Sequence, residues 1–365
     1  MSKPLWINDL FCGAGGMGLG FRQNGFRTAG AWDFDKYAVL SYGSNVSPKV
    51  KQADISQMTW DELPHANVWT FGFPCQDISV AGKQAGMVKG QTRSGLFYEV
   101  MRLLEETELN DPTRLPEILL AENVKAVKQY LPEIEKEYDQ RGYKLYYTLY
   151  NSKYWGVPQS RERYFMIGIR KDLPQKFQFP IEQHENVPKL SSILENEVDE
   201  KYYISDEKAS NIIEQALQKL GKSNGEINVV GRLNMKGMDV IKRVYDTDGI
   251  SPCLTTSEGG HRQPKILEPI VISKQGTEFN GFAEQSLCLL ARDYKGFGNQ
   301  DMNAVIAGYR VRKLTPREYM RLQGFPEEFK QGVSDTQMYK QMGNAVTVNV
   351  SKAIAEAIKQ YLESI

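Results

Sequence analysis

The sequence has few cysteines and histidines and no long hydrophobic run. Its 365 residues include 4 widely spaced cysteines, without a CxxC pair, and 3 histidines. Dispersed cysteines fit a reduced compartment better than a disulfide framework, and this set is too scattered for a metal site, so no metal is expected. No stretch approaches the roughly 18 apolar residues of a membrane span, and the N-terminus lacks the hydrophobic stretch of a signal peptide. We therefore expect a cytoplasmic protein that contacts no membrane.

The chain also lacks an excess of charge of either sign. Lys and Arg total 45, as do Asp and Glu. Nucleic-acid-binding proteins usually carry an excess of basic residues, so the totals count against that class unless basic residues cluster locally. The run YRVRKLTPR (309–317) has basic residues and no acidic one, and acidic residues gather in 195–207. This separation predicts a local basic strip.

Residues 1–170 show the alternation of an α/β domain. Short apolar segments alternate with stretches of helical periodicity, which predicts parallel βαβ units and a doubly wound, Rossmann-like sheet. The expected strands are 5–11, 27–32, 67–72, 116–121, 143–150 and 163–169, and the expected helices are 35–44, 94–107 and 124–141.

After residue 170 the composition changes. Residues 172–190 are rich in Pro, Gln and Lys and are typical of a linker, and 205–220 has the pattern of a helix. The Gly-, Thr- and Asn-rich stretch 229–310 predicts a small, irregular β-rich domain. We therefore expect a first domain at 1–180, a second at 181–310 and a C-terminal segment at 311–365. Within that segment, 315–323 and 346–363 are expected helices, and 343–365 is expected to pack back on the first domain.

A glycine-rich turn follows the first expected strand. FCGAGGMGLGF (11–21) spaces Gly13, Gly15 and Gly18 as G-x-G-x-x-G, and Asp33 lies 20 residues after Gly13. Glycines let the backbone approach a ligand at a helix N-terminus, and an acidic residue at this distance accepts hydrogen bonds from a ribose. The pattern predicts a nucleoside-containing cofactor and leaves NAD and S-adenosylmethionine as alternatives.

Reactive side chains gather at the ends of the expected strands. Cys75 in GFPCQ and Glu122 in LLAENV each follow a strand, and Arg161 and Arg163 in QSRER precede one. Taken singly, these are typical of a buried core cysteine, a helix cap and a solvated charge run. Together they predict one site at the sheet edge where ligands bind in α/β folds.

These motifs resemble, in order, those of DNA cytosine-5 methyltransferases of the bacterial and phage restriction–modification type. The resemblance rests on FCGAGGMGLGF, GFPCQ with GKQ (82–84), AENV, QSRER, RKLTPRE with RLQGFP (312–326), and QMGNAV (341–346). It implies an S-adenosylmethionine-dependent catalytic domain, duplex DNA as substrate and a target-recognition region within 171–310.

The resemblance also implies roles for individual residues. Cys75 would attack carbon 6 of a flipped-out cytosine, and Glu122 would hydrogen-bond its N3/N4 edge. Arg163 would hold the O2 side, and Arg161 would support it or a nearby phosphate. The implied methyl-donor site comprises Phe11, Gly13, Gly15, Asp33, Phe34, Asp54, Ile55, Asn344 and Ala345. Within this set, Asp33 would take the ribose hydroxyls, Phe34 would stack near the adenine, and Asp54 would accept from the adenine amino group. The methionine part would lie at Phe11, Gly13 and Gly15 with Asn344 and Ala345. For Asp54 the alternative of a helix N-cap stays open.

Two regions are expected to contact DNA. The segment 76–93 is long and glycine-rich enough to close over an extruded base, with Ser79, Lys83, Gln84 and Arg93 as candidates. The loops 257–265 and 292–303 carry side chains suited to base edges. As a set, the candidate base-reading residues are Arg262, Gln263, Arg292, Lys295, Asn299 and Gln300.

The expected partner is double-stranded DNA, bound by a monomer, and a cognate restriction endonuclease acting separately is a further candidate partner. Three other functions remain alternatives. They are an RNA cytosine-5 methyltransferase of the same fold, a nicotinamide-dependent oxidoreductase that uses the glycine-rich turn, and an inactive methyltransferase-like binding protein.

Overall fold

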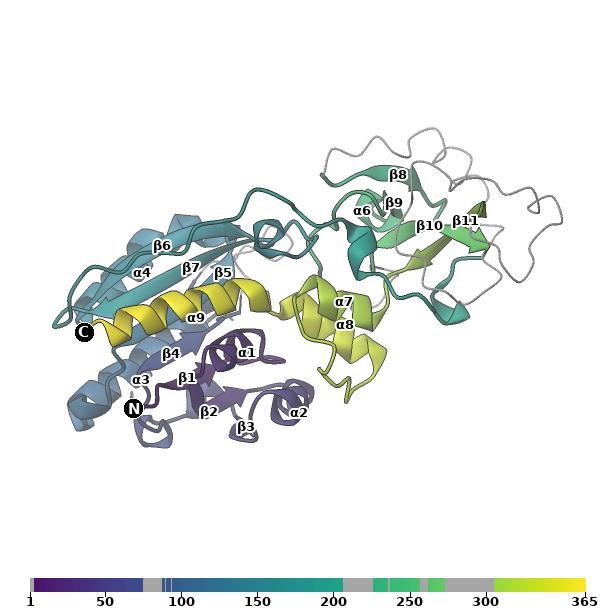
Figure 1. Cartoon of the computed structure of the whole chain (residues 1–365). Helices are drawn as coiled ribbons and strands as arrows, with labels where there is room; N and C mark the ends of the chain where they lie inside the picture. The colour runs from purple at the N-terminus through teal and green to yellow at the C-terminus, as the bar shows by residue number, and fades with distance from the viewer. Residues whose placement is uncertain are drawn as a thin grey trace. The chain divides into compact units, whose positions relative to one another are not determined.

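The computed structural model describes residues 3–74, 87–88, 90–92, 94–205, 226–235, 237–256, 262–272 and 305–365 (Figure 1). Contacts divide the chain into two units. Unit 1 comprises Met1–Glu195, Ile250–Gln263 and Pro316–Ile365, and unit 2 comprises Asn196–Gly249 and Pro264–Thr315. The sequence placed the boundaries after residues 180 and 310, whereas the contacts also assign 250–263 to unit 1.

Unit 1 is built on a seven-stranded sheet with the order β3-β2-β1-β4-β5-β7-β6. Its first five strands are parallel to one another, as strand–helix alternation predicted. The strands are β1 (Trp6–Leu10), β2 (Arg27–Asp33), β3 (Val50–Gln52), β4 (Val68–Phe71), β5 (Ile118–Val124), β6 (Tyr143–Asn151) and β7 (Glu162–Arg170). The predicted α/β, Rossmann-like fold class is confirmed, and β3 is a strand that the sequence did not predict.

Strand β7 departs from the expected parallel pattern, since it runs antiparallel to both β5 and β6. The connection from β6 to β7 holds one short 3₁₀ turn, Ser152–Trp155, and no crossover helix. A parallel return needs a crossover of a dozen or more residues, so the chain folds back as an antiparallel neighbour. The register pairs Val124 with Arg163, which puts the start of β7 beside the carboxyl end of β5.

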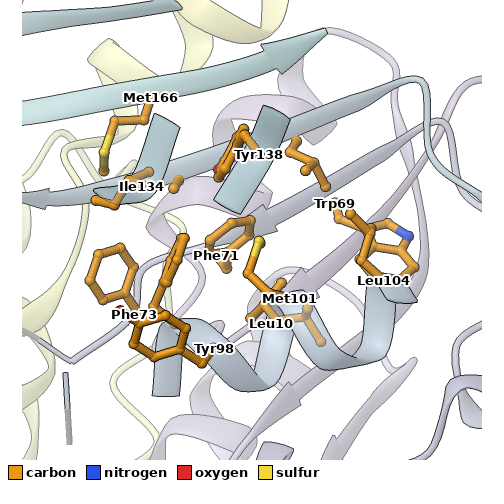
Figure 2. Packing of buried hydrophobic residues seen from close by; sticks show 14 of the residues in the cluster. Leu10, Trp69, Phe71, Phe73, Tyr98, Met101, Leu104, Ile134, Tyr138 and Met166 are labelled. Carbon is orange, nitrogen blue, oxygen red and sulfur yellow. The ribbon is translucent and has the colours of Figure 1, made fainter. Parts of the chain in front are cut away.

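Helices cover both faces of this sheet (Figure 1). The helices α3 (Phe97–Asn110) and α4 (Leu131–Gln140) pack on one face. Figure 2 shows Met101 of α3 and Ile134 and Tyr138 of α4 gathered around Phe71 of β4. A doubly wound sheet needs apolar side chains on both faces of its central strands, and β4 is buried at every position.

On the other face, α1 (Gly16–Gln23) packs against α9 (Val348–Glu363). The helices approach so closely that a Cβ at Gly20 would lie 2.6 Å from the backbone nitrogen of Lys352. Ser351 donates a hydrogen bond to the carbonyl oxygen of Met17, at 2.8 Å. The C-terminal helix therefore packs against the first helix of unit 1.

Three further helices belong to unit 1, namely α2 (Lys36–Asn45), α7 (Pro316–Leu322) and α8 (Asp335–Asn344). Capping side chains begin two of them, because Asp35 accepts from the backbone N–H of Tyr37 and Ser334 from that of Gln337. No helix in the described part of the chain has the length and apolar character needed to cross a bilayer.

Unit 2 contains a four-stranded sheet with the order β11-β10-β9-β8. It comprises β8 (Val229–Arg232), β9 (Arg243–Asp246), β10 (Lys265–Ile272) and β11 (Val305–Lys313), with the short α6 (Asp239–Lys242) before β9. Its core includes Val230, Val244, Leu267 and Val311. Residues 206–220 of the helix expected at 205–220 lie outside the described residues.

Two arginines of the basic run at 309–317 form ion pairs with acidic side chains. Arg310 pairs with Glu200 at 2.6 Å, and the fully buried Arg312 pairs with Glu268 at 2.8 Å. A buried guanidinium needs such a partner to offset its desolvation. These two arginines therefore add less to a basic surface strip than the sequence suggested.

A buried carboxyl group lies in β1. Asp9 is 1% exposed, and its Oδ1 accepts a hydrogen bond from Thr70 Oγ1 at 2.7 Å. Burial raises the pKa of Asp9 from 3.8 to about 7, although the hydrogen bond from Thr70 opposes the shift. Between these two pKa values the folded protein keeps a proton that the unfolded chain loses. The contribution of Asp9 to the free energy of unfolding therefore falls as the pH rises through this range.

We expect Asp9→Asn to remove this dependence. The neutral amide does not ionise, so the Tm of the variant relative to wild type should rise by about 2 to 4 °C between pH 5 and pH 8. Thermal unfolding of both proteins across this range measures the difference. A difference in Tm that does not change with pH would contradict the role of Asp9.

Candidate active site

A cavity of about 830 Å³ lies in unit 1, at the carboxyl ends of β1, β2, β4 and β5. It brings together most of the described residues that the sequence singled out. Those among its lining are Phe11, Gly13, Asp33, Phe34, Asp54, Ile55, Glu122, Arg161, Arg163, Asn344 and Ala345. Gly15 does not line the cavity. Gly15 is the N-cap of α1, with φ 96°, and a Cβ at this position would lie 2.5 Å from Val46 Cγ2. Gly15 therefore shapes the turn and allows its close packing.

The turn after β1 presents backbone to the cavity. Phe11 and Gly13 have positive φ angles of 52° and 56°, in the left-handed region. The N–H of Gly13 donates to Asp33 Oδ2 at 2.8 Å, and that of Asp35 donates to Asp33 Oδ1 at 2.8 Å. Burial raises the pKa of Asp33, while these backbone hydrogen bonds lower it. A carboxylate offers about four lone-pair sites, so Asp33 can still accept from a ribose.

Two apolar residues and a second carboxyl group line the cavity nearby. Phe34 is 72% exposed, so its ring is open to stacking, while Ile55 is buried. Asp54 caps a short 3₁₀ turn, accepting from the N–H of Ser56 at 3.0 Å and from its hydroxyl at 2.8 Å. The helix-capping alternative for Asp54 is thus present, and its contact with an adenine amino group stays a prediction.

Glu122 near the end of β5 is a buried acid beside a guanidinium. It is 7% exposed, and Arg163 Nε lies 3.1 Å from its Oε1. Burial raises the pKa of Glu122, and this effect outweighs the lowering by Arg163 and Arg161. A carboxyl group with a raised pKa can carry a proton to a ligand more readily than an ordinary glutamate.

Asn123 holds the segment that leads to Cys75. Its Nδ2 donates to the carbonyl oxygen of Phe73 at 2.9 Å, and Pro74 lines the cavity. Cys75 lies outside the described residues, so its role stays a prediction. The same holds for Ser79, Lys83, Gln84, Arg93, Arg292, Lys295, Asn299 and Gln300. Two of the candidate base-reading residues are described, and of these Arg262 is exposed and Gln263 is half-buried.

Arg161, just before β7, joins two other segments of unit 1, and the one at Gly343 and Ala345 lines the cavity with it. Its Nη2 donates to the carbonyl oxygens of Gly343 at 3.1 Å and Ala345 at 2.8 Å, and its Nη1 donates to that of Leu254 at 3.4 Å. The side chain is almost fully buried. In this arrangement Arg161 positions the wall, and its expected contact with the base or a phosphate stays a prediction.

Cys253 is a thiol beside the two arginines of the cavity lining, and the sequence gave it no role. Its Sγ lies 3.4 Å from Arg161 Nη1 and 3.9 Å from Arg163 Nη2, and the residue is exposed. Desolvation would raise the pKa of this thiol, but the two guanidiniums outweigh it and lower the pKa. Nothing in the local sequence SPCLTT signals this contact, which arises from the tertiary fold.

Helix α8 adds residues that the sequence also left without a role. Lys340 Nζ lies 3.2 Å from Asp35 Oδ2, and Gln337 and Gln341 line the cavity. The ion pair joins α8 to the residues after β2. The motif QMGNAV pointed to this region, but it assigned no contact to Gln341.

Comparisons with known proteins agree in one family. The model for C-5 cytosine-specific DNA methylases matches residues 5–360. The orphan methyltransferase M.SPBetaI of Bacillus phage SPbeta is 33% identical, and the alignment covers 98% of each chain. The type II methyltransferase M.NlaX of Neisseria lactamica is 32% identical over 98% of this chain and 97% of its own.

Solved structures support the fold. The crystal structure of S. pombe Dnmt2 methyltransferase aligns with a TM-score of 0.63 over 99% of each chain, at 20% identity. At this identity the likeness concerns the fold alone.

We expect Arg161→Ala to destabilise unit 1 strongly. The substitution leaves the carbonyl oxygens of Gly343, Ala345 and Leu254 without their charged donor, and it should lower the free energy of unfolding by about 3 kcal/mol or more. Arg163→Ala is the comparison variant. It removes the guanidinium beside Glu122, a carboxyl group with a raised pKa that can take up a proton when its partner is lost, so it should cost only about 1 kcal/mol. Denaturant unfolding measures both. Equal losses would remove the special structural role of Arg161.

The two described cysteines should differ in reactivity. Burial, Asp9 and Asp33 raise the pKa of Cys12 well above its usual value, whereas the pKa of Cys253 is lowered. In a Cys75→Ala background at pH 7, iodoacetamide should modify Cys253 on the order of tenfold faster than Cys12. Peptide mapping by mass spectrometry follows each thiol. Faster labelling of Cys12 would contradict the electrostatic effect of the arginines.

Proposed function

The chain belongs to the C-5 cytosine-specific DNA methylase family, and we propose that it methylates carbon 5 of a flipped-out cytosine in a specific short duplex DNA sequence through Cys75. Membership establishes the coarser activity, a DNA cytosine methyltransferase of the restriction–modification type that uses S-adenosylmethionine. The nicotinamide-dependent oxidoreductase is therefore not retained. The observation that carries the proposal is the ion pair of the buried Glu122 with Arg163, beside the segment that leads to Cys75.

The cavity suits the methyl donor. The acid Asp33, the exposed ring of Phe34 and the backbone turn at Gly13 match a ribose, an adenine and a polar tail. S-Adenosylmethionine supplies an electrophilic methyl group on a sulfonium. The residues proposed to hold it are Phe11, Gly13, Asp33, Phe34, Asp54, Ile55, Asn344 and Ala345, with Gly15 shaping the turn.

Covalent catalysis by Cys75 addresses the low nucleophilicity of carbon 5 of cytosine. The Cys75 thiolate adds to carbon 6, forming an S–C bond, and the displaced π electrons make carbon 5 enamine-like. Carbon 5 would then take the methyl group, leaving S-adenosylhomocysteine, and would lose its proton to a base. Breaking of the S–C bond then restores the ring double bond and frees Cys75.

Glu122 and Arg163 would bind the base during this sequence. The raised pKa of Glu122 favours a carboxyl group that supplies a proton near N3, which offsets the charge that builds up in the ring. Arg163, already 3.1 Å from Glu122, would hold the O2 side. Arg161 would act mainly through the wall that it fastens.

The DNA-binding part of the proposal rests on the sequence. A cytosine inside a duplex must be extruded at a cost of a few kcal/mol, and the segment 76–93 would close over it. The candidate base-reading residues of 257–265 and 292–303 would select the sequence. We further propose a monomer that acts in the cytoplasm, where its DNA substrate lies, with any cognate endonuclease acting separately.

Trapping on modified DNA tests the proposal. Fluorine at carbon 5 cannot leave as a proton does, so duplex DNA that carries 5-fluorocytosine in place of cytosine should form a stable adduct with the wild-type protein when the donor is present. Cys75→Ser should form none, and Cys288→Ser should retain the adduct. Denaturing gel electrophoresis and peptide mapping identify the linkage. An adduct that survives Cys75→Ser would refute the assignment of the nucleophile.

A further inference from the structure

Gln341 is a buried polar residue that the described fold does not satisfy. Its side chain is 5% exposed and lines the cavity. Neither its Nε2 nor its Oε1 has a hydrogen-bond partner among the residues that the structure describes. A buried amide without partners destabilises a protein, and such groups call for a specific explanation. A ligand in the cavity would supply the missing partners.

The position of Gln341 on α8 indicates which part of a ligand its amide would contact. Gln337, Lys340, Gln341 and Asn344 all line the cavity, and their spacing places them on one face of the helix. Lys340 pairs with Asp35, close to the proposed ribose ligand Asp33. At the other end, Asn344 precedes the loop that Arg161 fastens. Gln341 therefore lies between the proposed ribose site and the proposed methionine site.

The chemistry of an amide suits the zwitterionic amino-acid end of the donor. The Nε2 group of Gln341 can donate to a carboxylate while its Oε1 accepts from an ammonium. A charged side chain would match only half of that zwitterion, and it would carry an unpaired buried charge whenever the cavity held no ligand. A neutral amide avoids that cost.

We propose that Gln341 binds the amino-acid end of S-adenosylmethionine from α8. The residue holds the donor and takes no part in the transfer of the methyl group. This inference rests on the proposed function, because it assumes that the donor occupies this cavity.

Gln341→Met tests the inference, since methionine keeps the length of the side chain and removes its polar atoms. S-Adenosylhomocysteine should bind the variant about tenfold more weakly than it binds wild type. 5′-Methylthioadenosine, which lacks the amino-acid end, should bind both proteins equally. Isothermal titration calorimetry measures the four affinities. Without ligand, the Tm of the variant should equal or exceed that of wild type, because the substitution removes a buried unpaired amide.

Gln323→Met is the matched control. Gln323 is fully buried, and its amide is in use, because Nε2 donates to the carbonyl oxygen of Met342 at 2.6 Å and Oε1 accepts from Thr347 Oγ1 at 2.8 Å. This variant should have a lower Tm than wild type, and it should not weaken the binding of one of the two nucleosides more than that of the other. A purely structural Gln341 would behave in the same way.

The outcomes separate this inference from the proposed function. If wild type binds both nucleosides and Gln341→Met weakens neither, or weakens both equally, the role of Gln341 is overturned and the donor site stands. If wild type binds neither nucleoside, the proposed donor site fails and the inference fails with it. Selective loss of S-adenosylhomocysteine supports both.

Discussion

The antiparallel pairing of β7 with β5 is the constraint on which the candidate site depends. Its register sets Arg163 opposite Val124, so the guanidinium reaches Glu122 in the same sheet edge. In a parallel orientation the start of β7 would lie at the other edge of the sheet, roughly 27 Å away along a nine-residue strand. The connection from β6 to β7 is short and has no crossover helix, and this is why Glu122 and Arg163 can form an ion pair.

The two arginines of QSRER make different contacts at that end of the sheet. Arg161 donates to three backbone carbonyl oxygens in two segments, and its loss would leave both segments without this donor. Arg163 pairs with Glu122 and remains beside the cavity. Both also lie near the Cys253 sulfur, whose pKa they lower. The buried Arg161 therefore holds the wall together, and Arg163 partly offsets the effect of burial on the pKa of Glu122.

Local sequence patterns predicted the parts of this fold that local forces determine. Apolar runs located the long strands, and the glycine-rich turn and Asp33 come together as expected. The three-residue β3 was too short to show a period, and the polar α8 carries its buried Met338 and Met342 in a weak pattern. The direction of β7, the contact of Cys253 and the unpaired amide of Gln341 depend on segments far apart in sequence. No local pattern encodes them.

Several buried groups around the cavity lower the free energy of unfolding of the protein without ligands. Burial raises the pKa values of Asp9, Asp33 and Glu122, and Gln341 has no partner among the described residues. A core built for stability alone would replace such groups with apolar side chains. Their concentration around one cavity is typical of functional sites, where unfavourable burial is offset when ligands bind. The same groups would then favour the two proposed ligands, a methyl donor with a ribose and a zwitterionic end and a base that accepts a proton.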